Sequence, residues 1–285
     1  MIRQVGEKIP TDSFWLFEPT PTYRIAPLMG ADRAKAKGPG KNYVLALGYS
    51  ATYYEENLSN GETVRTMLDA GTNPPDGAVV NYFLDERSGC DATMTFLDSE
   101  GRLINTFSSE TNEDDRKQNG DMDQPVVAVE PGMNRFVWDM RSVSAPNIKG
   151  EGASGKGVPG PISPPGRYQV RLTVGGHSQI QNFELLKDPR VKATQTDLEK
   201  QHSLLMRISG KLAEANEAVN RSRNIRRQVD GWIGRASGTD KPDVLSDMGD
   251  RLTEKLRDIE DELVNAEVKG DLDRISKQAR LSAKL

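Results

Sequence analysis

The feature that most constrains this chain is a change in the periodicity of its apolar residues near position 190. Before that position lie most of the 16 prolines, nearly all of the aromatic residues and many of the 26 glycines. After it, one proline (Pro242), one aromatic residue (Trp232) and long helical repeats of apolar residues remain. The pattern predicts two modules of different class, a β-region over 1–190 and an α-helical region over 191–285.

Runs of β-branched, aromatic and alternating apolar residues bounded by turn residues are typical of β-strands. The clearest alternation places Tyr168, Val170, Leu172 and Val174 on one face. Several short strands at regular spacing predict an antiparallel β-sandwich. The predicted strands cover residues 42–47, 78–84, 92–97, 102–107, 132–140, 167–174 and 178–186.

The second region predicts two long antiparallel helices separated by a break at 234–242. Thr194 or Thr196 is expected to be the N-cap, with Glu199 completing a capping box from Thr196. A pair of helices buries one seam, so a third element or the sandwich should cover the rest. The first stripe contains Leu198, Leu205, Ile208, Leu212, Ala215 and Val219, and the second Leu245, Met248, Leu252, Leu256, Ile259, Leu263 and Ala266.

A third amphipathic stretch over 271–285 carries Leu272, Ile275, Ala279 and Leu281. It stops without a cap, which predicts a truncated third helix. Two polar segments interrupt the β-region, an acidic one over 108–124 and one rich in glycine and proline over 142–165. The second is too poor in apolar groups to offset its ordering entropy alone, so we expect a mobile excursion between strands.

Composition excludes several classes of function. The 38 basic and 42 acidic residues give a net charge of −4, which argues against a dedicated nucleic-acid binder. The single cysteine, Cys90, excludes an internal disulfide and a cysteine zinc site. The N-terminal residues lack the apolar segment of a signal peptide, and the apolar run at 14–17 is too short to span a membrane.

Candidate sites for chemistry are few. A glycosidase would need two carboxylates in a cleft. Among the acidic residues, only Asp139, beside Trp138, is marked by an apolar neighbourhood in the sequence. The alternative is a structural role, in which the Asp139 carboxylate makes a hydrogen bond to a neighbouring turn. The two histidines, His177 at a hairpin tip and His202 on a helix face, have no nucleophile near them in sequence. We therefore predict no catalytic, cofactor-binding or metal-binding residue.

Three charged or glycine-rich segments are also better explained as ordinary surface segments than as ligand-binding sites. The acidic residues over 110–123 do not have the spacing of an EF-hand, so a solvated loop is expected. The glycines over 150–160 lack the strand and the Lys-Ser/Thr of a phosphate loop. Arg221, Arg223, Arg226 and Arg227 could form an RNA-binding face, but no aromatic residues interleave with them. Tyr49, Tyr53 and Tyr54 would form an exposed platform on one sheet face in a carbohydrate-binding sandwich, or would pack in the core.

A series of short motifs follows a recognisable order. Phe17-Glu18-Pro19 and Tyr23-Arg24 are followed by the segment 73–78 (Asn-Pro-Pro-Asp-Gly-Ala) and by 97–101 (Leu-Asp-Ser-Glu-Gly). The segment 134–141 (Asn-Arg-Phe-Val-Trp-Asp-Met-Arg), Pro165-Gly166-Arg167-Tyr168 and Asp188-Pro189-Arg190 complete the series. The order resembles the C-terminal region of bacterial sortilin-like (BNR-repeat) β-propeller proteins, which are often labelled glycosyl hydrolases. The part over 73–190 also looks like the immunoglobulin-like module of flagellar-hook capping proteins.

The resemblance covers about residues 14–285 and implies an immunoglobulin-like β-sandwich followed by a helical hairpin. The propeller that would precede this region is absent from the sequence, so no hydrolytic residue carries over. The stretch 42–68 departs from the pattern and is expected to be an insertion.

The implied role is a non-catalytic accessory region. It would pack on a β-propeller in cis or in trans, or form a homo-oligomer through its helices. A glycoside hydrolase or a carbohydrate-binding sandwich is the alternative. The family context suggests an exported protein.

Overall fold

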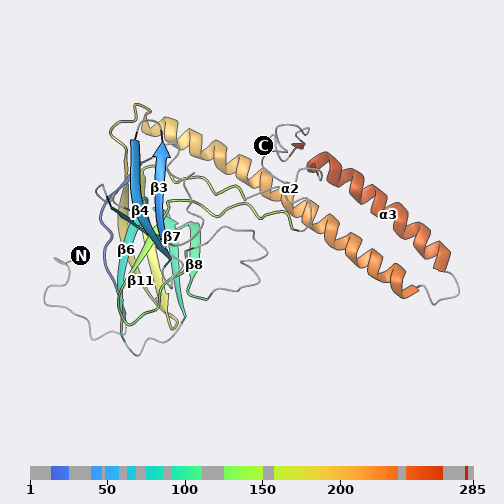
Figure 1. Cartoon of the computed structure of the whole chain (residues 1–285), viewed down its shortest axis with the longest axis horizontal. Helices are drawn as coiled ribbons and strands as arrows, with labels where there is room; N and C mark the ends of the chain where they lie inside the picture. The colour runs from blue at the N-terminus through green and yellow to red at the C-terminus, as the bar shows by residue number, and fades with distance from the viewer. Residues whose placement is uncertain are drawn as a thin grey trace. The chain divides into compact units, whose positions relative to one another are not determined.

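The computed structural model describes residues 14–25, 40–46, 49–57, 63–68, 75–85, 91–110, 125–149, 157–236, 242–265 and 280–281. A β-rich region is followed by two long helices that pack together, which confirms the division expected from the periodicity (Figure 1). The chain forms two compact units. We call Met1–Asn112, Asp123–Val143 and Ile162–His202 the β unit, and Glu113–Met122, Ser144–Pro161 and Ser203–Leu285 the helical unit.

Two sheets form the main body of the β unit. One has the strand order β1-β6-β9 and the other β2-β11-β10-β7-β8. Neighbouring strands run antiparallel except β2, which runs parallel to β11. The expectation of a wholly antiparallel arrangement is therefore wrong at this edge. The bounds are β1 (Phe14–Leu16), β2 (Thr22–Arg24), β6 (Ala78–Leu84), β7 (Ala92–Asp98), β8 (Leu103–Ser108), β9 (Gly132–Trp138), β10 (Gly166–Val174) and β11 (His177–Lys187).

Alternation along these strands directs one set of side chains into a shared core. The predicted apolar face of β10, from Tyr168 to Val174, is buried, and β6 buries every second residue in the same way. The centre of the core is aromatic. The rings of Trp138 and Phe96 stack with their centroids 4.3 Å apart, and Phe183 meets both edge-on. Trp138 is therefore the core anchor that the sequence predicts, and it joins β9 to the opposite sheet.

At the outer edge of β1, two glutamine side chains of β11 occupy the position of a neighbouring strand. Gln179 Nε2 donates to the Phe14 carbonyl at 3.1 Å, and its Oε1 accepts from the Leu16 N–H at 2.9 Å. Gln181 Nε2 donates to the Leu16 carbonyl at 3.1 Å. These bonds join the edges of the two sheets, so the sheets curl together as a half-barrel.

The stretch expected to be an insertion forms a sheet of its own. Strands β3 (Gly40–Ala46), β4 (Tyr49–Asn57) and β5 (Thr63–Met67) pair in the order β3-β4-β5. Only β3 corresponds to a predicted strand. The many tyrosine, threonine and glutamate residues of β4 obscured its period of two, because both of its faces carry polar groups.

Helix α2 (Gln195–Ala236) begins where the sequence predicts, but its capping box differs in one residue. Thr194 Oγ1 accepts from the Asp197 N–H at 3.2 Å, and Asp197 Oδ2 accepts from the Thr194 N–H at 3.0 Å. Glu199 instead accepts from the Gln195 side chain at 2.9 Å. The shorter aspartate closes the reciprocal cap from Thr194. Helix α3 (Pro242–Leu263) follows, whereas the predicted third helix lies outside the described residues except for Arg280 and Leu281.

Candidate functional site

Helices α2 and α3 of the helical unit run antiparallel (Figure 1). Ser222 Oγ of α2 donates to the Leu256 carbonyl of α3 at 3.2 Å. Farther along α2, Val229 and Ile233 contact Gly249, so closely that a methyl group in place of its hydrogen would meet Ile233 Cδ1 at 2.6 Å. Residue numbers that increase along α2 contact residue numbers that decrease along α3, so the two helices are antiparallel. Gly249 allows their close approach, because it has no side chain.

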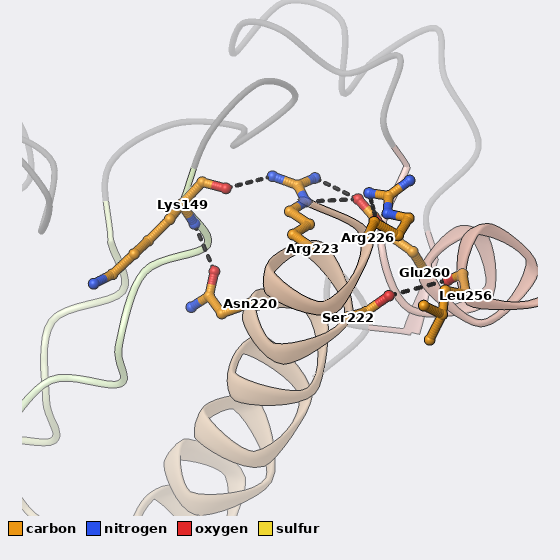
Figure 2. Close-up of polar contacts among 7 residues, drawn as sticks. All are labelled: Lys149, Asn220, Ser222, Arg223, Arg226, Leu256 and Glu260. Carbon is orange, nitrogen blue, oxygen red and sulfur yellow. Dashed lines mark hydrogen bonds and ion pairs between the residues drawn. The ribbon is translucent and has the colours of Figure 1, made fainter. Parts of the chain in front are cut away.

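A buried ion group joins α2 to the C-terminal part of α3, and we call its residues, Arg223, Arg226 and Glu260, the Glu260 clamp (Figure 2). Arg223 donates to Glu260 Oε1 from Nε at 2.7 Å and from Nη2 at 2.5 Å. Arg226 Nη2 donates to Oε2 at 2.5 Å. The Glu260 side chain is only 6% exposed, and both of its oxygens are engaged by guanidinium groups. Such a carboxylate fixes the register of two helices.

The segment 144–149 runs beside α2, and we call it the strap. Asn216 Nδ2 donates to the Pro146 carbonyl at 2.8 Å, and Asn220 Nδ2 donates to the Asn147 carbonyl at 2.9 Å. The Lys149 N–H donates back to Asn220 Oδ1 at 2.7 Å, and Arg223 Nη1 donates to the Lys149 carbonyl at 2.6 Å (Figure 2). These helical side chains satisfy a backbone that has no strand partner.

For residues 144–149, the strap corrects the expectation of a mobile excursion over 142–165, whereas residues 150–156 lie outside the described part of the chain. That expectation considered only apolar burial, whereas the strap is held by polar side chains spaced at i, i+4 and i+7 on one helix face. The signal in the sequence was a pair of asparagines four residues apart in a long helix, where asparagine is a poor helix former. We find the same kind of anchoring at the end of the segment, where the Gly160 N–H donates to Ser144 Oγ at 3.1 Å.

Apolar residues of both helices remain uncovered within the described part of the chain. We call six of them the apolar face, and each is between 36 and 68% exposed. The face comprises Ile225 and Trp232 of α2 and Leu245, Met248, Leu252 and Ile259 of α3. Most of the predicted α3 stripe therefore points away from α2. One stripe residue, Leu256, contacts α2, and Gly249, the buried Thr253 and Glu260 lie on the same face of α3.

Helical geometry places all six residues on one side of the pair. At 100° per residue, the exposed apolar residues of α3 are rotated roughly 80° from its contact face with α2. Ile225 and Trp232 are rotated by roughly the same angle, in the same sense, from the α2 contact face. For two antiparallel helices, equal rotations of the same sense point to the same side. The apolar face is therefore continuous across both helices.

Of the candidate residues for acid–base chemistry, Asp139 and His202 make structural contacts. Asp139 Oδ1 accepts from the Arg141 N–H at 3.0 Å, which is the bond to a neighbouring turn expected of it. His202 Nδ1 lies 3.0 Å from the Ile162 carbonyl, and burial lowers the pKa of its imidazole. Tyr168 Oη donates to the Pro164 carbonyl at 2.6 Å, and burial raises its pKa to about 12. His177 lies exposed at the start of β11.

The tyrosines proposed as a carbohydrate platform do not share one exposed face. Tyr53 is 2% exposed, and its neighbour Tyr54 is 48% exposed. Successive residues of a strand point to opposite faces, so Tyr53 and Tyr54 lie on opposite faces of β4. This confirms core packing for Tyr53 and leaves one tyrosine of the three shown to be exposed.

The four arginines of α2 separate into two groups. Arg223 and Arg226 turn to the Glu260 clamp, whereas Arg221 and Arg227 are exposed. The expectation of a uniformly solvated helix face is wrong for the inner two, because the acid that binds them lies 34 residues or more away in sequence. Residues 111–124 of the acidic segment and residues 150–156 of the glycine-rich segment lie outside the described residues, as does Cys90.

Two further properties concern all of the described residues. No group of three or more histidine, cysteine, aspartate or glutamate side chains there is placed to hold a metal ion. None of the helices described here combines the length and the apolar character needed to cross a membrane. Comparison with protein-family models, curated proteins and solved structures found no significant match to this chain.

Proposed function

We propose that this chain is a non-catalytic interaction module whose α2–α3 pair binds another protein through the apolar face. The observation that carries the proposal is that six large apolar side chains gather on one side of the helical pair. Single exposed apolar residues are common on protein surfaces, but a continuous apolar patch is typical of a protein-binding site.

The contact between the helices supports this interpretation. An amphipathic helix stabilises a fold by directing its apolar stripe to its neighbour. Here α3 meets α2 through a glycine, a threonine and the Glu260 clamp, and most of its apolar stripe points elsewhere. Burying that stripe against a partner would recover about 25 cal/mol for each Å² of apolar surface removed from water.

Within this proposal, the β unit is an immunoglobulin-like sandwich that carries the helices. Two sheets with one apolar core and the buried Trp138 support that finer classification. The kind of partner rests on the sequence resemblance alone, which implies a β-propeller in cis or in trans. No observation favours the glycoside hydrolase or the carbohydrate-binding alternative, since Asp139 and Tyr53 have structural roles.

The proposal is tested by site-specific photo-crosslinking of the full chain in the cells that produce it. A photo-reactive residue replaces Met248 on the apolar face or, as a matched control, Met133, a similarly exposed methionine of β9. We expect a defined adduct from position 248 that is absent from position 133. Equal labelling at both positions, or no adduct at 248, would overturn the proposal.

Reconstitution with the identified partner gives the quantitative test. The double variant M248S/L252S should weaken binding by at least about tenfold, because truncating apolar anchors at an interface costs about 1–2 kcal/mol each. The control L103S/M133S removes two exposed apolar side chains from the β unit and should leave the affinity unchanged. Circular dichroism at 222 nm checks that both variants keep their helices.

A further inference from the structure

We infer that the partner of the apolar face is the same face of a second copy of this chain, with the two α3 helices antiparallel. This inference rests on the proposed function and names its partner. The observation behind it is the order of charges along the outer flank of the apolar face, on the side of α3 that lies away from α2.

Four exposed charged residues form this flank. Arg251 and Lys255 come first, and Asp258 and Glu262 follow. At 100° per residue they fall within about 60° of one another around the helix, next to Met248, Leu252 and Ile259. Between Arg251 and Glu262 the flank is therefore basic in its first half and acidic in its second half.

This order is complementary to itself in one orientation only. In a two-fold symmetric contact, a residue i that meets j of the second copy is matched by j meeting i. Antiparallel α3 helices would place Arg251 and Lys255 opposite Asp258 and Glu262 of the second copy, twice. A parallel arrangement would place like charges opposite each other, which is unfavourable.

Charge and apolar burial have separate roles in this contact. Exposed ion pairs are weak, so they select the orientation and contribute little to the affinity. The affinity comes from the apolar face, where Trp232 and Met248 are the most exposed of the six residues. Two helical pairs that meet in this way form a four-helix arrangement, in which each pair supplies the cover that the other lacks.

The experiment measures the mass of the full chain by light scattering over a range of concentrations. The wild-type chain should dimerise. The variant R251E/K255E has an entirely acidic flank and D258K/E262K an entirely basic one, so each should dimerise at least about tenfold more weakly. All four side chains are exposed, so folding is not at risk, and circular dichroism confirms it.

Mixing the two charge variants gives the decisive test of the charge pairing. An equimolar mixture of the acidic-flank and basic-flank variants should form a heterodimer at least as tight as the wild-type dimer. The fourfold variant R251E/K255E/D258K/E262K restores the complementary order and should dimerise like the wild type.

Two outcomes would overturn the inference. One is a dimer whose affinity does not change in the charge variants. The other is a monomeric wild-type chain, which means that a different protein or another segment of the same chain covers the apolar face. A monomer whose position 248 still crosslinks to an identified protein leaves the proposed function standing, so the two failures are distinguishable.

Discussion

The core of the β unit and the contact between α2 and α3 stabilise structure by different means. The β unit buries aromatic rings against one another, with Phe96, Trp138 and Phe183 at its centre. The helical contact buries a carboxylate and two guanidinium groups, while most apolar side chains of α3 stay exposed. Apolar packing supplies stability, whereas a buried ion pair costs desolvation and supplies register. The helical unit therefore leaves apolar surface exposed to solvent.

The largest expected effect is on the aromatic core. Trp138→Ala should lower the free energy of unfolding of the β unit by about 3–5 kcal/mol, because it leaves a large cavity beside Phe96 and removes the Nε1–H bond to the Arg141 carbonyl. Urea denaturation followed by near-ultraviolet circular dichroism measures it. Trp138→Phe is the control and should lose markedly less, and equal losses would show that ring packing is not the source.

The second effect concerns the Glu260 clamp. Glu260→Gln should destabilise the helical unit by about 3 kcal/mol, since it leaves two guanidinium groups without their carboxylate. Urea denaturation followed at 222 nm measures this loss. The triple variant E260L/R223M/R226M should recover most of it, because replacing a whole buried ion group with apolar residues is often neutral or stabilising. A triple variant as unstable as the single one would show that the clamp itself supplies net stability.

The strap should give a smaller, local effect. Asn220→Ala removes the bonds to Asn147 and Lys149, each worth about 0.5–1.5 kcal/mol. Exchange of the Lys149 amide hydrogen should accelerate roughly tenfold, while exchange in the β unit stays unchanged. Asn224→Ala, an exposed position on the same helix, is the matched control. Unchanged exchange at Lys149 would mean that the strap does not depend on Asn220.

The smallest effect is a pH dependence in the β unit. Hydrogen bonds from the Arg190 side chain and N–H lower the pKa of Asp188 from 3.8 to about 2. The folded-state pKa lies below the unfolded value, so this contribution is present above about pH 4 and is lost as the pH falls toward 2. The difference in melting temperature between the wild type and Asp188→Asn should therefore shrink over that range. A difference that is constant with pH would assign it to something other than ionisation.

The sequence predicted the elements whose periodicity arises from burial in this chain. Strands β6, β7, β9, β10 and β11 alternate because one face packs on a common core, and α2 was delimited by its cap and its stripe. The three-residue strands β1 and β2 were missed because they are too short to show a period. Strand β4 was missed because its residues are mixed in polarity on both faces.

The site was predicted much less well than the fold. The apolar stripe of α3 was visible, but a sequence shows only that a stripe exists and not which neighbour it faces. Glu260 was one of 42 acidic residues, and its link to Arg223 depends on a helix crossing more than 30 residues away in sequence. Asn216 and Asn220 bind backbone groups of a loop, and their spacing of four residues does not show which segment they bind.

The glutamine bonds at the edge of β1 have a consequence for solubility. An unpaired strand edge is a template for pairing with another chain, which is a route to aggregation. A primary amide carries a donor and an acceptor side by side, so Gln179 imitates the backbone of a missing strand. Glutamate at the same position could only accept, and leucine could do neither. A chain that exposes apolar side chains on its helices has thus closed one strand edge of its sheet to such pairing.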